Sequence, residues 1–317
     1  MKSNFFEVLR PGINSTFQDL GRENFYHIGL PFSGAMDNRN YLLSNTLVNN
    51  KYEAAIEFAY QGPLLKYYGK STVIAVTGDV NFSITKKNKK LINGECYKNY
   101  VLENEDELDI ISTNKSVYGY LSVSGGFVLE KILNSYSTFS RAKIGPFKGE
   151  KLFVNQKILI NKTSNFKTQK KIKYVNTKIE YIRIIKATNF DFFSKKAVEN
   201  FLNKEFIVTK LTDRMGMRIK GPIIENIKEK NIRSEGIVKG TIQIPPDGNP
   251  IIKLSDHGTI GGYPKIGVVI SADYDKLVQL VPNTKIKFKL VNLPEAEKIY
   301  EIYRLETDNL INQIKWI

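Results

Sequence analysis

Residues 234–264 decide how this chain folds, and they read SEGIVKGTIQIPPDGNPIIKLSDHGTIGGYP. Residues 240–244 and 250–254 alternate apolar and polar side chains, which predicts two half-buried strands. Residues 245–249, Pro-Pro-Asp-Gly-Asn, predict a tight reversal between them. Further turns at residues 256–259 and 261–264 leave backbone N–H groups open. We therefore expect a polar pocket at the end of a β-sheet, lined by Gln243, Asp256, Thr259 and Tyr263.

The composition is that of a globular chain of 317 residues, 42% hydrophobic and 11% aromatic, long enough for two domains of ordinary size. No apolar run approaches the roughly 20 residues of a membrane helix. Residues 1–10 lack the apolar region of a signal peptide, so we expect a cytoplasmic protein. A single cysteine, Cys96, excludes an internal disulfide and a multi-cysteine zinc site.

The net charge of +15 raises the question of nucleic-acid binding, but its distribution argues against it. Lysines are scattered among many asparagines, and the densest runs, at residues 168–173 and 86–90, fall in expected loops. A solvated surface that attracts an acidic partner explains the charge better.

The first half predicts a β domain over residues 1–165. A strand is expected at residues 5–9, and Asp37 is placed to cap a helix over residues 38–47. Short strand-like runs then follow at close spacing, and helical periodicity is nearly absent, which predicts a barrel or sandwich. The clearest runs are residues 73–77, 81–84, 97–102, 108–111 and 118–123.

The second half predicts another β domain over residues 178–292, after a linker at residues 161–178. Strands are expected at residues 179–186, 206–211, 268–270 and 285–290, and short helices at residues 194–202 and 273–280. Pro294 starts a C-terminal helix within residues 293–317.

Several motifs limit the possible chemistry. Two histidines, His27 and His257, exclude a three-histidine metal site, and we expect no metal. Asp256 and His257 are neighbours on an extended chain and point apart, so they do not form a catalytic relay. Residues 62–71 end in Gly-Lys-Ser but have Leu64 where a P-loop needs glycine, and they lead into a strand.

Lysine is much commoner than arginine in this chain, so the few arginines are candidates for functional positions. The planar guanidinium of arginine binds carboxylates and phosphates bidentately, which lysine does not. Arg22 and Arg214, each in a glycine-rich turn, are the favoured functional candidates, against the alternative of structural ion pairs. Glycines also lie near Ser33, Asp37 and Asp256. For these three residues, the alternative to a functional role is a structural role in a turn or a helix cap.

A set of motifs in fixed order resembles the C subunit of bacterial 5-oxoprolinase. That family is also called allophanate hydrolase subunit 2, antagonist of the sporulation-kinase inhibitor, and biotin-dependent carboxyltransferase subdomains A and B. The resemblance spans about residues 5–290. The motifs are Gly12-x3-Thr16-x-Gln18-Asp19-x-Gly21-Arg22, Gly29-x-Pro31-x-Ser33-Gly34-Ala35-x-Asp37, Asp213-Arg214-Met215-Gly216-x-Arg218, Ser234-Glu235-Gly236, Gln243-x-Pro245-Pro246-x-Gly248 and Gly261-Gly262-Tyr263-Pro264.

The resemblance implies a mainly β fold: two cyclophilin-like β-barrel domains with a few short helices and a C-terminal helix. It also implies a heteromeric complex with a B subunit of related fold and an A subunit. Such complexes use ATP to open the lactam of 5-oxoproline to L-glutamate, since phosphorylation of the lactam oxygen activates a stable amide for attack by water. ATP is not held by a Walker motif in this chain.

The resemblance also implies roles for the candidate residues. Asp37, Asp256 and Tyr263 are the expected catalytic groups, with either aspartate as base. Arg22 and Arg214 would hold carboxylate or phosphate, and N–H groups near Gly34 and Gly262 would stabilise developing charge. The expected substrate- or phosphate-binding residues are Gln18, Arg22, Ser33, Gly34, Arg214, Gln243, Thr259 and Gly262.

Three positions depart from the family pattern: Tyr136 and Glu150 replace arginines, and Asn24 replaces a glycine. Two other functions stay open. One is carboxyl transfer from carboxybiotin to a urea-like or amide substrate, with biotin carried elsewhere because this chain lacks Met-Lys-Met. The other is a non-catalytic protein that binds and antagonises the homologue of the B subunit.

Overall fold

The computed structural model describes residues 3–161, 169–174, 179–225 and 232–316. It divides into two compact units. The first comprises residues 1–22, 33–175 and 307–317, and the second comprises residues 23–32 and 176–306. The predicted linker at residues 161–178 lies largely outside the described residues, so the predicted domain boundaries there stay predictions.

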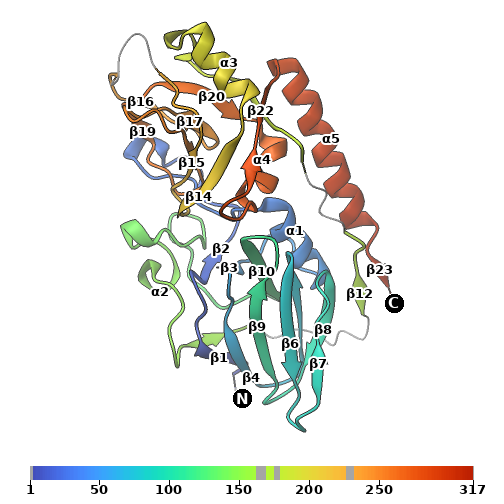
Figure 1. Ribbon diagram of the computed structural model, residues 1–317. Coiled ribbons are helices and arrows are strands. Elements are labelled where there is room, and N and C mark those ends of the chain that lie inside the picture. The colour runs from blue at the N-terminus through green and yellow to red at the C-terminus, as the bar shows by residue number, and fades with distance from the viewer. Residues whose placement is uncertain (1–2, 162–168, 175–178, 226–231, 317) are drawn as a thin grey trace. The chain divides into compact units, whose positions relative to one another are not determined.

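The first unit is built from two β-sheets (Figure 1). One has the strand order β11-β1-β4-β9-β6-β7 and the other β2-β3-β10-β5-β8-β12-β23. The strands of the first sheet are β1 (Phe5–Arg10), β4 (Leu64–Tyr68), β6 (Val80–Thr85), β7 (Leu91–Asn93), β9 (Glu107–Thr113) and β11 (Lys157–Leu159). Those of the second are β2 (Thr16–Gln18), β3 (Ala55–Ala59), β5 (Thr72–Thr77), β8 (Lys98–Leu102), β10 (Tyr118–Val123), β12 (Lys170–Lys171) and β23 (Lys315–Trp316).

Burial explains the patterns of these strands. β1 and β6 alternate buried and less buried residues, as strands with one face on a core do. β3, β5 and β10 are buried along their whole length. Their inner faces join one core that includes Phe6, Phe58 and Leu121. The outer face of β5 is covered by helix α1 (Asn38–Leu47), whose Leu43 belongs to the same cluster as Val73.

The second unit is organised by an eight-stranded sheet of order β21-β14-β15-β18-β17-β20-β13-β22. Its members are β13 (Ile182–Lys186), β14 (Phe206–Thr212), β15 (Gly216–Lys220), β17 (Thr241–Gln243), β18 (Ile251–Lys253), β20 (Lys265–Val269), β21 (Lys285–Ile286) and β22 (Phe288–Leu290). The two edge strands are consecutive in the chain, separated only by Lys287, so the sheet is nearly closed into a barrel. The single strand predicted at residues 285–290 is therefore wrong, because closure divides it between opposite edges.

Smaller elements complete both units. The second contains the pair β16 (Glu235–Gly236) and β19 (Ile260–Gly261), helices α3 (Lys195–Asn203) and α4 (Ser271–Val278), and short 3-10 turns at Tyr26–Ile28 and Phe190–Phe192. The first contains α2 (Pro146–Gly149) and a 3-10 turn at Ser140–Ala142. None of the helices among the described residues is both long enough and apolar enough to cross a bilayer.

The C-terminal helix α5 spans Leu293–Asn312, as Pro294 predicts. Its first part packs in the second unit, where Ile299 and Tyr303 contact the cluster around Ile270. Its last part belongs to the first unit, where Thr307 accepts a hydrogen bond from Arg39 Nε at 2.9 Å. The expected mainly β fold with a few short helices and a C-terminal helix is confirmed.

Candidate functional site

The carboxylate of Asp19 organises the polar centre of the first unit. It accepts hydrogen bonds from Gly21 N at 2.8 Å, Ser135 Oγ at 2.7 Å and Tyr136 N at 2.7 Å, and also from the Ser137 hydroxyl. These donors come from two loops more than a hundred residues apart in sequence. The buried carboxylate therefore ties the loop after β2 to the 135–138 segment.

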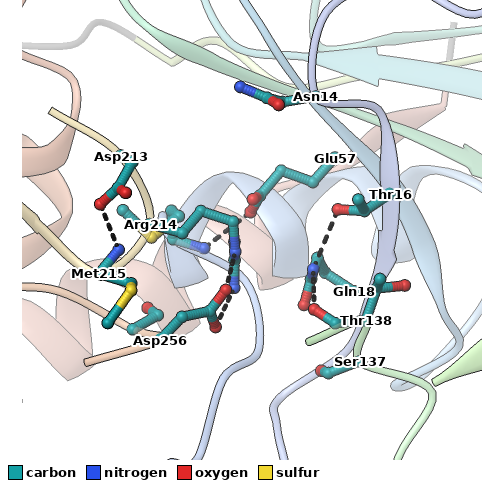
Figure 2. A network of polar contacts seen from close by, with 12 residues as sticks. Asn14, Thr16, Gln18, Glu57, Ser137, Thr138, Asp213, Arg214, Met215 and Asp256 are labelled. Atoms are coloured by element: carbon teal, nitrogen blue, oxygen red, sulfur yellow. Dashed lines mark hydrogen bonds and ion pairs between the residues drawn. The ribbon is translucent and has the colours of Figure 1, made fainter. Parts of the chain in front are cut away.

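Gln18 and Arg22 are fixed by the same segment. Gln18 Nε2 donates to Thr16 Oγ1 and to the Thr138 carbonyl, each at 3.0 Å (Figure 2). Arg22 is only 2% exposed and donates from Nη2 to the Ser137 carbonyl. Gln18 Oε1 is buried and accepts no hydrogen bond from the described residues. Since buried acceptors are nearly always paired in proteins, this oxygen is available to a ligand.

Ser33 and Gly34 form a left-handed turn packed against the Asp19 loop. Their φ angles are +54° and +80°, and Ala35 N donates to the Asp19 carbonyl at 2.8 Å. A Cβ on Gly34 would lie 2.8 Å from Gly21 N, so only glycine fits there. Ser33 Oγ is buried and has no hydrogen-bond partner among the described residues.

Asp37 caps α1 as predicted. Its Oδ1 accepts from Asn40 N at 2.9 Å and its Oδ2 from Asn40 Nδ2 at 2.6 Å. Its own N–H donates to the Tyr120 hydroxyl at 2.7 Å, and that hydroxyl donates to Glu57 Oε2 at 2.7 Å. Burial, together with the Glu57 charge, raises the pKa of Tyr120 well above its usual value. The cap is thus one end of a buried polar chain, and its role as a base stays a prediction.

Arg214 and Asp256 form a bidentate ion pair in the second unit. Arg214 Nε lies 2.7 Å from Asp256 Oδ2, and Nη2 lies 3.0 Å from Oδ1 (Figure 2). Asp256 N also donates to the Arg214 carbonyl at 2.8 Å. The preceding Asp213 accepts from Met215 N at 2.8 Å and Gly216 N at 3.1 Å, which shapes the turn into β15. Two of the predicted residues are therefore direct partners.

Of the remaining predicted residues of the second unit, Gln243 and Tyr263 contact each other directly. The buried Gln243 side chain donates from Nε2 to the Tyr263 carbonyl at 3.2 Å, and a Cβ on Gly261 would lie 2.8 Å from that nitrogen. The Tyr263 side chain itself is 37% exposed. Thr259 is buried, and its carbonyl accepts from Ile237 N at 2.9 Å. Gly262 follows Gly261 and accepts from Ile232 N at 2.8 Å.

His257 is buried and forms no relay with Asp256. Its Nδ1 donates to the Gly258 carbonyl at 2.7 Å, which leaves Nε2 facing the Tyr26 hydroxyl at 2.7 Å. The Tyr26 hydroxyl also lies 2.9 Å from the Ile237 carbonyl oxygen. Burial raises the pKa of Tyr26 to about 12 and lowers the pKa of His257. This contact holds the 23–32 segment in the second unit.

The predicted residues are divided between the two units. Gln18, Arg22, Ser33, Gly34 and Asp37 lie in the first, and Arg214, Gln243, Asp256, Thr259, Gly262 and Tyr263 lie in the second. In the part of the chain that the structure describes, no three His, Cys, Asp or Glu residues gather to hold a metal ion.

A family model described as carboxyltransferase domain, subdomain A and B, matches residues 28–290, which is most of the chain. The chain belongs to this family. It is 31% identical to the C subunit of 5-oxoprolinase from Haemophilus influenzae over 316 residues, which cover 98% of both chains. It is 25% identical to the C subunit of 5-oxoprolinase from Escherichia coli, over 98% of this chain and 97% of that one.

Among solved structures, the urea amidolyase of K. lactis matches with a TM-score of 0.88 and 26% identity. That match covers 98% of this chain but 20% of the yeast chain, so this protein corresponds to about a fifth of the urea amidolyase. The family resemblance drawn from the motifs is therefore confirmed, and homologues of this carboxyltransferase-family chain belong to enzymes.

Two family positions that lack their arginine lie in the first unit. Tyr136 binds Asp19 through its backbone N–H, and Lys131 Nζ lies 5.1 Å from the centre of its ring. A cation therefore remains beside this position. Glu150 is exposed and is the C-cap residue after α2, in which Phe147 and Lys148 both have positive φ. The serines on either side of Tyr136, Ser135 and Ser137, both donate to Asp19.

Sequence reasoning missed Glu57, Tyr120 and the partners of Asp19. Glu57 carries a weak signal, because a glutamate in the middle of the apolar strand Ala-Ile-Glu-Phe-Ala must find buried donors. Ser135 and Ser137 fall within a family motif, but nothing in the sequence connects them to Asp19.

Proposed function

We propose that this chain is part of an ATP-dependent 5-oxoprolinase that opens the lactam of 5-oxoproline to L-glutamate together with the A and B subunits. The observation that carries the proposal is the end-to-end match to the C subunit of the Haemophilus influenzae enzyme, which covers 98% of each chain. A match over nearly the whole of both chains favours the same role, whereas the urea amidolyase match covers only a fifth of that chain.

The polar clusters support chemistry on an anionic amide. Opening the lactam breaks its C–N bond and adds water, so negative charge develops on the carbonyl oxygen. In the first unit, Gln18 and Ser33 offer buried polar atoms without protein partners among the described residues. We assign these side chains, with Arg22 and the turn at Gly34, to ligand binding. Asp37 stays the candidate base of that cluster.

In the second unit, Arg214 and Asp256 are held together as an ion pair. Asp256 as base would have to act while it holds Arg214, because both of its oxygens accept from the guanidinium. We therefore assign this pair first to orienting the Arg214 loop. Gln243, Thr259, Gly262 and Tyr263 provide polar groups on neighbouring turns for the same ligand-binding role.

ATP supplies the phosphoryl group that activates the lactam. The Gly-Lys-Ser segment at residues 69–71 leads directly into strand β5 rather than a helix, so it does not form a P-loop. We propose that ATP is used by the complex without a Walker site in this chain, and that the A and B subunits are the partners.

Carboxyl transfer from biotin is the second candidate. It is favoured by the family description and by the structural match to urea amidolyase. In that case a separate carrier brings biotin, and the substrate is a urea-like or amide compound.

The test is co-expression with the neighbouring A and B subunits, followed by glutamate release from L-5-oxoproline with and without ATP. We expect ATP-dependent release that avidin does not inhibit. Inhibition by avidin together with a requirement for bicarbonate would favour carboxyl transfer. A stable complex in which this chain binds the B protein and lowers the activity of the other components would favour the antagonist function.

A further inference from the structure

A cavity of about 440 Å³ opens on the outer face of the second unit's sheet, where β14, β15 and β18 run side by side. It has the size of a small-molecule site. The pairing of β14 with β15 shifts register between Val208 and Thr212, and this irregular stretch forms one wall. Such bulges are common next to functional sites.

Three cations line this cavity, Lys210 on β14, Arg218 on β15 and Lys253 on β18, and the last two come from strands that pair directly. Gly216 pairs with Lys253 and Arg218 with Ile251, so these four residues share the outer face. Met217 and Ile252, which alternate with them, are fully buried on the other face. Because Gly216 has no side chain, the position opposite Lys253 stays open. The Arg218 and Lys253 side chains therefore line one hollow.

The cavity wall carries three cationic side chains but one acidic one, Asp213. Within the described ranges, neither Arg218 nor Lys253 forms an ion pair with an acidic side chain. Asp213, the acidic residue of the cavity wall, already accepts two backbone hydrogen bonds from Met215 and Gly216. Burial and the neighbouring Arg218 charge lower the pKa of Lys253, and the Asp213 charge opposes them only in part. A bound anion would relieve this repulsion.

We propose that this cavity binds an oxyanion, the carboxylate or phosphoryl group of a small-molecule ligand, between Arg218 and Lys253. The guanidinium of Arg218 forms a bidentate contact, and the ammonium of Lys253 adds a second charge. The Nε and Nη2 edge of Arg214, the arginine first expected to hold this group, is occupied by Asp256. The identity of the ligand as 5-oxoproline rests on the proposed function, whereas the oxyanion site does not.

The test is calorimetric titration of the full chain, alone and in its complex, with inorganic phosphate, L-5-oxoproline and 2-pyrrolidinone, the same lactam without a carboxylate. The variants are Arg218→Met, Lys253→Met and Lys253→Arg. Lys220→Met is the matched control, because Lys220 is exposed on the same strand and does not line the cavity. We expect Arg218→Met and Lys253→Met to weaken oxyanion binding about tenfold or more. Lys253→Arg and Lys220→Met should retain it.

The three ligands distinguish a site for a carboxylate from a site for a phosphoryl group. Binding of L-5-oxoproline but not of 2-pyrrolidinone supports a carboxylate site, and binding of phosphate alone supports a phosphoryl site. The proposal is overturned if neither anion binds, if 2-pyrrolidinone binds as well as 5-oxoproline, or if Lys220→Met weakens binding as much as Arg218→Met. Anion binding without glutamate release by the complex would overturn the proposed function and leave this site standing.

Discussion

Replacing Asp256 by asparagine tests the buried ion pair of the second unit. The Arg214 and Asp256 side chains are 14% and 8% exposed, and two charge-assisted hydrogen bonds join them. Asparagine keeps the shape of the side chain but leaves the Nε and Nη2 edge of Arg214 facing a neutral amide. Removing one partner of a buried pair costs about 3–5 kcal/mol. Because asparagine can still accept one hydrogen bond, we expect a loss at the lower end, about 3 kcal/mol.

The matched control is Glu205→Gln. Glu205 pairs with Lys285 at 3.1 Å on the surface of the same unit, where the side chains are 45% and 67% exposed. Exposed pairs of this kind contribute less than about 1 kcal/mol. A double variant, Arg214→Met with Asp256→Leu, removes both charges of this pair and should be more stable than Asp256→Asn, since replacing a buried pair by apolar side chains costs less than removing one of its members.

Hydrogen exchange is the suitable assay, because a chain of two units does not have to unfold in one step. The free energy of opening is measured at amides of β15 and β18, such as Met217 and Ile252, which pair directly. The reasoning is refuted if Asp256→Asn and Glu205→Gln change this free energy of opening equally. It is also refuted if the free energy of opening of the double variant is no higher than that of Asp256→Asn.

Three further predictions concern other parts of the chain. Gly34→Ala should lower the urea midpoint far more than Gly29→Ala, because both glycines have positive φ but only Gly34 lacks room for a Cβ; equal effects would contradict the account. Tyr120→Phe should lower the free energy of opening at β10 amides in hydrogen exchange by about 1–3 kcal/mol, since the N–H of Asp37 loses its acceptor, and an unchanged value would speak against the buried polar chain. For His257, burial lowers the folded pKa, so the unfolded state gains its proton first as the pH falls below about 6.5. Stability should therefore fall with decreasing pH in the wild type and fall less in His257→Gln, and parallel curves for the two proteins would refute this.

Local signals in the sequence predict local structure well. Asp37 precedes a helical run and caps it, and Pro294 lies in the first turn of α5. The 245–249 turn joins β17 to β18 as an antiparallel pair, with Gly248 at a φ of +72°. Asp256 and His257 have different partners, as predicted, although they lie in a turn in which His257 N donates to the Leu254 carbonyl, and not on an extended chain.

Long-range arrangements are not readable in the same way. Tyr26 lies in the first tenth of the chain but bonds Ile237 and His257 in the second unit. The carboxylate of Asp19 accepts hydrogen bonds from Ser135 and Tyr136, which lie far along the sequence. No periodic pattern around either residue predicts this contact. Closure of the second sheet splits what looks like one strand at Lys287. Each of these depends on the topology of the whole unit rather than on neighbouring residues.

The most direct test of the central claim is glutamate formed from L-5-oxoproline and ATP by the A and B subunits and this chain together, compared with each of the three possible pairs. The account predicts glutamate from the complete set and none from the pair that lacks this chain. Full activity from the A and B subunits alone would contradict it.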